Sequence, residues 1–221
     1  MADKGDLGSN CRFGRGLMKI VFATGNPHKL QELREIAGDC GIEFILPPQG
    51  FDPVENGETF EENSLIKAQE AARVSGEMAL ADDSGLCVEA LDGAPGIHSA
   101  RYAQTPQARI DKLLTVLDGI ENRKAKFVCA MTLVDKNGKI LFKTVGECHG
   151  EIAETQSGTN GFGYDPIFIP TPSSAILAPS PTLGRRKNIS MADMSEEDKN
   201  KISHRGVALR KVLEYLDKFS S

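Results

Sequence analysis

A buried strand that runs straight into a helix limits the fold of this chain more than any other feature. The strand is predicted over Lys19–Ala23, and in the turn that follows Asn26 suits the N-cap and Pro27 the first helical position. Gly38 suits the C-terminal stop of the helix, and apolar side chains recur between them at helical spacing: Leu30, Leu33 and Ala37. Strands and helices that alternate in this way indicate a fold of the α/β class.

The start of this predicted helix is suited to binding an anion. Backbone N–H groups exposed at a helix start attract phosphate oxygens, and Gly25 lets the backbone approach them without an intervening Cβ. Lys29 falls in the first turn, where a cation opposes the helix dipole by roughly 0.3 to 1 kcal/mol unless an anion binds there. Anion binding is the prediction, and a solvated lysine is the alternative.

Two adjacent carboxylates, Asp82 and Asp83, end a second apolar run and are followed by Ser84 and Gly85. Neighbouring anions repel each other unless a proton or a cation lies between them. Mg²⁺ prefers hard carboxylate oxygens, so such a pair is typical of a metal site or of a site that activates water. The alternative is a solvated turn in which Asp82 caps and Ser84-Gly85 bends the chain.

A third segment adds charged groups before and within another helix. Thr59 and Glu62 have the spacing of a capping box that opens a helix. Asn63 and Lys67 are four residues apart, so they share a helix face from which both could reach a polyphosphate, although ordinary surface polarity explains them equally well. Glu55 precedes the helix and could join the Asp82-Asp83 pair as a third carboxylate around a cation.

A glycine-rich loop with two aromatic residues spans residues 158–166. Phe162 or Tyr164 could stack on a nucleobase, and Asp165 could accept a hydrogen bond from its edge. Downstream, His204 and Arg205 offer donors near the start of a helix whose apolar residues have core spacing: Leu209, Val212, Leu213 and Leu216. Taken singly, the loop and the His-Arg pair each fit a structural role, with the aromatic residues anchoring a turn to the core.

The order in which these segments occur is more specific than any one of them. Together they make the chain resemble the inosine triphosphate pyrophosphatase family, the dITP/XTP diphosphatases. The resemblance runs from about residue 19 to the C-terminus. It rests on seven motifs: Ala23-Thr24-Gly25-Asn26-x-x-Lys29, Gly57-x-Thr59-Phe60-x-Glu62-Asn63, Lys67-Ala68, Ala81-Asp82-Asp83-Ser84-Gly85-Leu86, residues 93–102, Gly161-Phe162-Gly163-Tyr164-Asp165-Pro166 and Ile202-Ser203-His204-Arg205-Gly206.

The resemblance implies a fold and a reaction. The fold would be an elongated mixed β-sheet flanked by helices, with two lobes and an active-site cleft between them. The reaction would be hydrolysis of ITP, dITP or XTP between the α and β phosphates, which gives a nucleoside monophosphate and pyrophosphate, requires Mg²⁺ and cleanses the nucleotide pool. Family members are typically homodimers, so a homodimer is expected as well.

The resemblance also implies roles for individual residues. Asp83 would accept the proton of the attacking water, and the metal would be held or organised by Glu55, Asp82 and Asp83. The triphosphate would be bound by Thr24, Gly25, Asn26, Pro27, His28, Lys29, Lys67, Ser84 and Lys199. The nucleoside would be bound by Phe162, Gly163, Tyr164, Asp165, His204 and Arg205.

This chemistry is plausible on physical grounds alone. Attack of water on a triphosphate requires cations that neutralise developing charge and a base that orients the nucleophile. The lysines and Mg²⁺ meet the first requirement, and one carboxylate of the Asp pair meets the second. A pocket that offers donors to a 6-oxo group is left with unpaired donors when a 6-amino group arrives, which separates hypoxanthine from adenine.

Composition favours a compact enzyme. The 221 residues, of which 40% are hydrophobic, can form one domain, predicted over residues 18–221 after a disordered tail at 1–17. The net charge of −5 argues against broad nucleic-acid binding. Five widely spaced cysteines show no zinc or disulfide pattern, so a reducing cytoplasm is the expected location. No apolar run is long enough for a membrane span, and no signal peptide is predicted.

Further elements and alternatives complete the sequence prediction. Strands are expected over Ala125–Val134 and Ile140–Cys148 with a hairpin turn between them, and a helix after Thr105 up to Leu117.

The segment from Thr171 to about Ser190 is longer than the family's usual connection; a solvated loop is favoured over a mobile lid. Alignment across it leaves Lys201 as an alternative to Lys199. A pyrophosphatase with a different base preference and a non-catalytic nucleotide-binding protein are the alternative functions.

Overall fold

A computed structural model describes residues 18–171 and 189–219 of the chain. The predicted tail at 1–17 and nearly all of the predicted insertion lie outside the described residues. The described residues form a six-stranded sheet in the order β2-β1-β3-β4-β5-β6. The strands are β1 (Met18–Phe22), β2 (Ile42–Ile45), β3 (Ala79–Val88), β4 (Lys124–Val134), β5 (Ile140–Ile152) and β6 (Phe168–Pro170).

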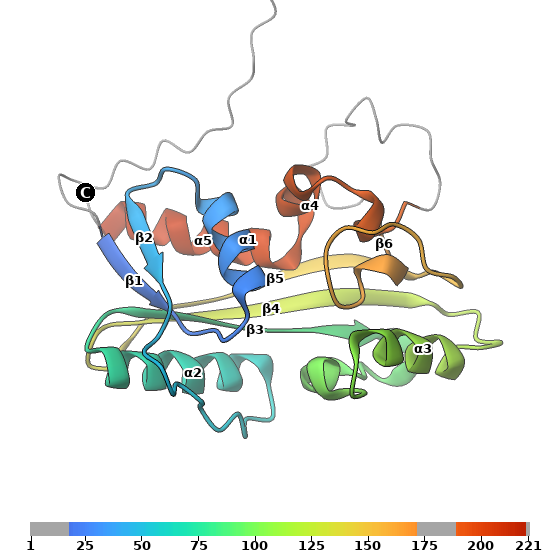
Figure 1. Cartoon of the computed structure of the whole chain (residues 1–221), viewed down its shortest axis with the longest axis horizontal. Coiled ribbons are helices and arrows are strands. Elements are labelled where there is room, and N and C mark those ends of the chain that lie inside the picture. Colours follow the sequence, from blue (N-terminus) through green and yellow to red (C-terminus); the bar gives the residue numbers. More distant parts are fainter. Residues whose placement is uncertain (1–17, 172–188, 220–221) are drawn as a thin grey trace, which may run out of the picture.

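The sheet is mixed, and its three long strands form its centre. β1 is parallel to both β2 and β3, whereas β3, β4, β5 and β6 pair antiparallel in succession. Helices α1 (Pro27–Ala37) and α5 (His204–Phe219) lie on one side of the long strands, and α2 (Phe60–Ser75) and α3 (Pro106–Val116) lie on the other (Figure 1). The predicted α/β fold with a mixed sheet flanked by helices is therefore confirmed.

The helices begin where their capping residues predict. The side chain of Asn26 accepts a hydrogen bond from the backbone N–H of His28, and Pro27 is the first residue of α1. Thr59 caps α2 through the N–H of Glu62, and Thr105 caps α3 through the N–H of Ala108. Each cap satisfies a backbone donor that the helix itself leaves unpaired. In α2 the Glu62 carboxylate accepts from Glu58 N rather than from Thr59 N, so the reciprocal half of the predicted capping box is shifted by one residue.

Separate apolar clusters hold these layers together. α1 and α5 pack on the sheet through Leu33, Val212 and Leu216 among others, and α3 covers the far end of the strands with Leu113 and with its C-cap residue Leu117. α2 contributes small residues instead, mainly alanines, which let it approach β3 closely. The close approach lets Lys67 of α2 reach Asp83 of β3.

The predicted hairpin is also confirmed. β4 and β5 are joined by a turn in which Gly138 N donates to Asp135 O and Gly138 has φ of 80°. The elements that the sequence does not predict include the short strands β2 and β6 and the helix α4 (Glu196–Ile202), which has seven residues and one buried apolar side chain. Within the described ranges, no helix is long and apolar enough to cross a membrane.

Candidate active site

The central feature of the site is the edge of β3 just beyond the end of β1. β1 pairs with β3 at Val21–Ala79 and Phe22–Leu80, and Ala23 N donates to Leu80 O before the chain turns away. β3 continues for eight more residues, through Asp82 and Asp83. Ligands of open α/β sheets bind outside the carboxyl ends of strands, at the point where successive connections run to opposite sides. The carboxyl end of β1, which lies between β2 and β3, is such a point, and the two carboxylates lie beside it. The solvated turn considered for this segment is wrong, because residues 79–88 form one continuous strand.

Asp82 and Asp83 point to opposite faces of the sheet, because successive side chains of a strand alternate. The Asp82 carboxylate faces α1 and α5, where it accepts from Lys29 Nζ at 3.0 Å and from Arg205 Nη2 at 3.0 Å. Ser84, two residues along the same face, donates its hydroxyl to Asp82 at 2.8 Å. These contacts bind Asp82 to the protein rather than leaving it free for a ligand.

Asp83 faces α2 on the other side of the sheet. Lys67 Nζ donates to Asp83 Oδ1 at 2.7 Å and lies 3.5 Å from Glu55 Oε2. Lys67 and Asp83 are nearly buried, whereas the Glu55 side chain is 32% exposed. The sequence prediction that Glu55 lies beside the Asp pair is consistent with this placement, and Lys67 is the residue that joins the two carboxylates.

The two aspartates differ in acidity. Burial disfavours the charged form of Asp82, but Lys29, Arg205 and Lys67 outweigh burial and lower the pKa of its carboxyl. Burial dominates at Asp83 and raises its pKa despite the ion pair with Lys67. Lys67 itself has a raised pKa, because Asp82 and Asp83 together outweigh its burial. Asp82 is thus the more acidic carboxylate of the pair, and Asp83 is the more basic one.

A second buried ion-pair group lies next to Asp82 and centres on Glu32 of α1. Arg205 Nη1 donates to Glu32 Oε2, and Lys199 Nζ lies 3.7 Å from Glu32 Oε1. Lys199 also lies 3.0 Å from Asp165 Oδ2. Sequence analysis missed Glu32, since one glutamate in an amphipathic helix carries no signal and its partner Arg205 is 173 residues away.

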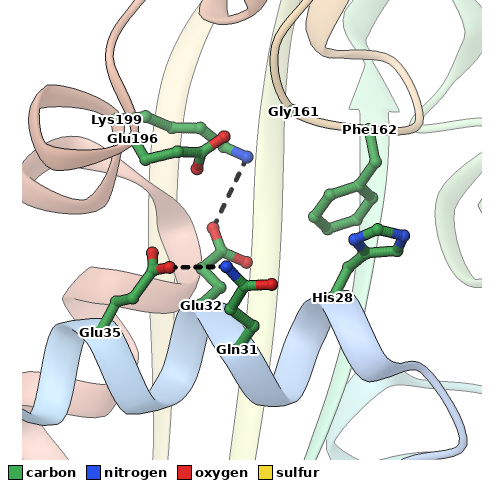
Figure 2. A pocket seen from close by; sticks show the side chains of 8 residues that line it. All are labelled: His28, Gln31, Glu32, Glu35, Gly161, Phe162, Glu196 and Lys199. Atoms are coloured by element: carbon green, nitrogen blue, oxygen red, sulfur yellow. Dashed lines mark hydrogen bonds and ion pairs between the residues drawn. The ribbon is translucent and has the colours of Figure 1, made fainter.

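A pocket opens between α1 and the glycine-rich loop (Figure 2), with a volume of about 160 Å³. Phe162 and His28 extend toward each other at one end, with ring centroids 6.3 Å apart and planes inclined by 23°. Lys199 and Glu32 face each other across the pocket, and Lys199 Nζ also lies 4.9 Å from the Phe162 ring centroid. Glu32 Oε1 is buried without a hydrogen-bond partner among the described residues.

The turn before α1 uses several of its own donors internally. Asn26 N donates to Thr24 Oγ1, His28 N donates to Asn26 Oδ1, and Pro27 has no N–H. Gly25 is exposed, and a Cβ added there would meet no atom within 4 Å. The ring of His28 contacts Phe162 rather than this turn, so the structure places His28 at the end of the site where the nucleoside was expected and not with the predicted triphosphate residues.

The glycine-rich loop divides its aromatic residues between the site and the core. Phe162 is half-buried beside the pocket, whereas Tyr164 is buried and donates its hydroxyl to Ser99 O at 3.1 Å. Asp165 accepts from Phe162 N and pairs with Lys199, so it holds the loop closed. Gly163 has φ of 64°, a left-handed conformation that glycine adopts without strain.

Of the predicted His-Arg pair, Arg205 reaches the site more directly. His204 is buried, and its ring stacks on Phe127 at 4.8 Å between centroids. Its Nδ1 has no hydrogen-bond partner in the described structure, and burial lowers the pKa of the imidazole well below its usual value. Arg205 bridges Asp82 and Glu32, and the two carboxylates outweigh its burial and raise its pKa.

These contacts show where two lysines and an asparagine, whose roles the sequence leaves open, lie in the structure. Lys199 belongs to the buried cluster, whereas Lys201 pairs with Glu197 and Asp198 on the surface. Asn63 does not face the site as a polyphosphate ligand would. Its amide accepts from Gly57 N and donates to Gly57 O, which fixes the loop that precedes α2.

The predicted metal residues fit a hard divalent cation in part. Within residues 18–171 and 189–219, no three His, Cys, Asp or Glu side chains converge as a metal site, and Asp82 points away from the other two. Glu55 and Asp83 remain, on either side of the Lys67 ammonium. One or two carboxylates completed by water and substrate phosphates are what Mg²⁺ commonly uses, so the donor set fits an ion that binds together with a phosphate.

Comparisons with known proteins find similar sequences over nearly the whole chain. The model of the Ham1 family matches residues 20–215. A dITP/XTP pyrophosphatase of Synechocystis sp. is 41% identical over 194 residues, which cover 88% of this chain and 93% of the relative. A dITP/XTP pyrophosphatase of Desulforamulus reducens is 41% identical over 210 residues, which cover 91% of this chain and 96% of the relative.

Solved structures show the same fold. The Staphylococcus aureus Ham1 protein superposes with a TM-score of 0.75 and 37% identity, covering 91% of this chain and 99% of that protein. A HAM1 protein from Coxiella burnetii gives a TM-score of 0.73 and 38% identity over the same shares of the two chains. The family inferred from the ordered motifs is confirmed: the chain belongs to the Ham1 family.

Proposed function

We propose that this protein hydrolyses non-standard purine nucleoside triphosphates, namely ITP, dITP and XTP, to the nucleoside monophosphate and pyrophosphate with Mg²⁺ as cofactor. The observation that carries the proposal is the buried Asp83 carboxylate, whose raised pKa suits a general base and which lies beside Lys67 and Glu55 at the open edge of β3. The dITP/XTP pyrophosphatases of two bacteria, similar over nearly their whole length, support the choice of substrate.

The chemical step assigns a role to each side of β3. Asp83 accepts a proton from the water that attacks the phosphorus, and Lys67 and Lys29 contact phosphate oxygens from the two faces of the sheet. When bound by Glu55 and Asp83, the divalent ion would neutralise charge that develops on the phosphates. Asp82 stays ionised and holds Lys29 and Arg205 in position.

The nucleoside end is assigned to the pocket in Figure 2. The Phe162 ring offers a face for a purine, and His28 lies opposite it. Lys199 and Arg205 are donors near the pocket, and a 6-oxo group accepts from such donors whereas a 6-amino group cannot. A homodimeric assembly, a cytoplasmic location and the absence of nucleic-acid partners remain predictions.

Pyrophosphate release from ITP, dITP, XTP, ATP and GTP with Mg²⁺ tests the proposal. We expect release from the first three, and loss of about 10²–10⁴-fold in kcat for Asp83→Asn, as for removal of a general base. Glu70→Gln is a matched carboxylate-to-amide control, since Glu70 pairs with Arg73 on the exposed side of α2. Equal activity on all five nucleotides would reject the base preference, and full activity of Asp83→Asn would favour a base other than Asp83.

A further inference from the structure

The Lys67 ammonium lies where a cation shared by Asp83 and Glu55 would lie. Its Nζ is 2.7 Å from Asp83 Oδ1 and 3.5 Å from Glu55 Oε2. The Lys67 side chain is 9% exposed, so the ammonium has exchanged most of its water for these two carboxylates. A divalent ion cannot bind both carboxylates until this ammonium moves away.

The backbone around Lys67 is held firmly, so the movement must come from its side chain. Ser64 shares a hydrogen bond of 2.7 Å with Thr132 of β4, one turn before Lys67. Ala68 and Ala71 are fully buried against the sheet beside Ala81. Asn63 fixes the loop that precedes α2. The flexible four-carbon stem of a lysine can change direction without any shift of this helix.

A displaced Lys67 needs another anion, and the other buried carboxylates of the site, among the described residues, already have cationic partners. Asp82 is on the opposite face of β3 and already pairs with Lys29 and Arg205. Glu32 pairs with Arg205, and Asp165 pairs with Lys199. Leaving a nearly buried ammonium without a partner is strongly unfavourable. An incoming triphosphate would supply the missing negative charge.

We propose that Lys67 blocks the divalent-cation position in the nucleotide-free protein and moves onto a phosphate when a triphosphate binds, so that metal binding depends on the triphosphate. The proposal rests on the proposed function for the identity of the ligand. It also gives Lys67 a second effect. As long as Lys67 donates to Asp83 Oδ1, that oxygen is not available to a water molecule, so the base becomes free only when substrate is present.

The test measures Mn²⁺ retained by the protein on ultrafiltration, without turnover. We expect weak retention by the unaltered protein alone and at least tenfold tighter retention when inorganic tripolyphosphate is added. Lys67→Met, which removes the ammonium and leaves both carboxylates, should bind Mn²⁺ at least tenfold more tightly without tripolyphosphate. Lys67→Arg keeps the charge and should stay weak.

Lys126→Met is the matched control, because it removes an ammonium that pairs with a carboxylate, Glu147, at a partly exposed position outside the site. It should leave retention of Mn²⁺ in the absence of tripolyphosphate unchanged. Retention by the unaltered protein that is tight and independent of tripolyphosphate would overturn the proposal, and this comparison does not require any variant to fold. Tighter retention by Lys126→Met equal to that by Lys67→Met would also overturn it, since any lost cation would then have the same effect.

Failure of the proposed function can be distinguished from failure of the role proposed for Lys67. A protein that retains Mn²⁺ only with tripolyphosphate, but releases no pyrophosphate from ITP, would support the role of Lys67 and reject the hydrolysis. Pyrophosphate release from ITP, together with Mn²⁺ retention that does not change when tripolyphosphate is added, would support the hydrolysis and reject the role of Lys67. The two outcomes are separate because the binding measurement uses neither a nucleobase nor catalysis.

Discussion

The Asp82 side chain is 1% exposed and accepts from Lys29, Arg205 and Ser84. Such an arrangement gives the carboxylate a structural task, because Lys29 belongs to α1 and Arg205 to α5. Asp82 therefore joins two helices that are far apart in sequence at the central strand. The adjacent Asp83 contacts α2 instead, and it is the carboxylate to which we assign the role of base.

Asp82→Asn should destabilise the protein by about 3–5 kcal/mol at neutral pH, the usual effect of breaking a buried ion pair. The folded-state pKa of Asp82 is lowered. The stabilisation is therefore complete above the unfolded-state pKa of about 4 and is lost as the pH falls below it. Urea unfolding at a series of pH values measures this. The difference in free energy of unfolding between the unaltered protein and Asp82→Asn should shrink below about pH 4. A difference that stays constant with pH would contradict the assignment of this stabilisation to the ionised Asp82. Asp111→Asn, at an exposed site, should show little difference at any pH.

Substitutions of the two aromatic residues of the glycine-rich loop should have different effects, one on nucleotide binding and the other on stability. Phe162→Ala removes the ring beside the pocket and should lower kcat/KM for ITP by about 5–150-fold, the range for one stacked base. Inhibition by tripolyphosphate should be unchanged, since that ligand has no base. Tyr164→Phe removes the hydroxyl that donates to Ser99 O and should cost about 1 kcal/mol of stability with kcat/KM unaltered. The reverse pattern would show that Tyr164 and not Phe162 holds the base.

Whether the sequence predicts a feature of the site depends on how far apart along the chain the contacting residues are. The Asn26, Thr59 and Thr105 caps are local, so residue type and spacing were enough to predict them. Glu32 depends on partners far along the chain, which a single sequence does not reveal. The Asp82-Asp83 pair was interpreted as two converging anions, whereas the continuation of β3 through both residues separates them onto two faces.

At the scale of elements, β3 is the component on which the others are arranged. It pairs with β4 over ten residues, and its far half packs against the short helix η2 (Gly96–Arg101). This contact is close at Gly85, where an added Cβ would lie 2.7 Å from Ser99 Oγ and 2.9 Å from the Phe60 ring. The glycine in the Asp-Asp-Ser-Gly segment, interpreted from the sequence as a bend, instead permits close packing.

Gly85→Ala should therefore destabilise the protein by about 1–3 kcal/mol, as overpacking of a tight contact does. Gly25→Ala is the matched control for stability, because the added Cβ meets no atom within 4 Å there. Thermal unfolding of the two variants measures the difference. Equal stability of both would mean that η2 can move away from β3 at little cost.

Short elements escape prediction from the sequence for a physical reason. β2 has four residues and α4 has seven, which is too short for periodicity to stand out. Both are held by neighbours instead. β2 pairs with β1, and α4 supplies Lys199 to the ion pair with Asp165.

At the scale of the whole molecule, the site is nearly balanced in charge without any ligand. Lys29, Lys67, Lys199 and Arg205 pair with Glu32, Glu55, Asp82, Asp83 and Asp165, which gives four cations and five carboxylates. The buried carboxylates are thus neutralised by the protein itself, so the fold does not need a metal ion.

Removal of divalent ions with EDTA should abolish hydrolysis and leave the thermal midpoint unchanged within about 1 °C, well below the shift of 2–4 °C that 1 kcal/mol produces in a chain of about this size. Differential scanning calorimetry with and without EDTA measures this. Addition of Mg²⁺ with a slowly hydrolysed ITP analogue should raise the midpoint through binding to the folded state. A midpoint lowered by several degrees in EDTA would show that the ion contributes to folding.

The alternation of side chains along β3 also restricts how chains of this family can change in length. Deleting or inserting one residue between Ala79 and Asp82 would exchange the directions of the two aspartates. Asp82, which joins α1 and α5, would then face α2, and Asp83, the proposed base, would face Arg205. The same event in the turn after Asp135 would alter only the tip of the hairpin. We therefore expect insertions and deletions of one residue to be tolerated in the hairpin turn and to be excluded from the central strand β3.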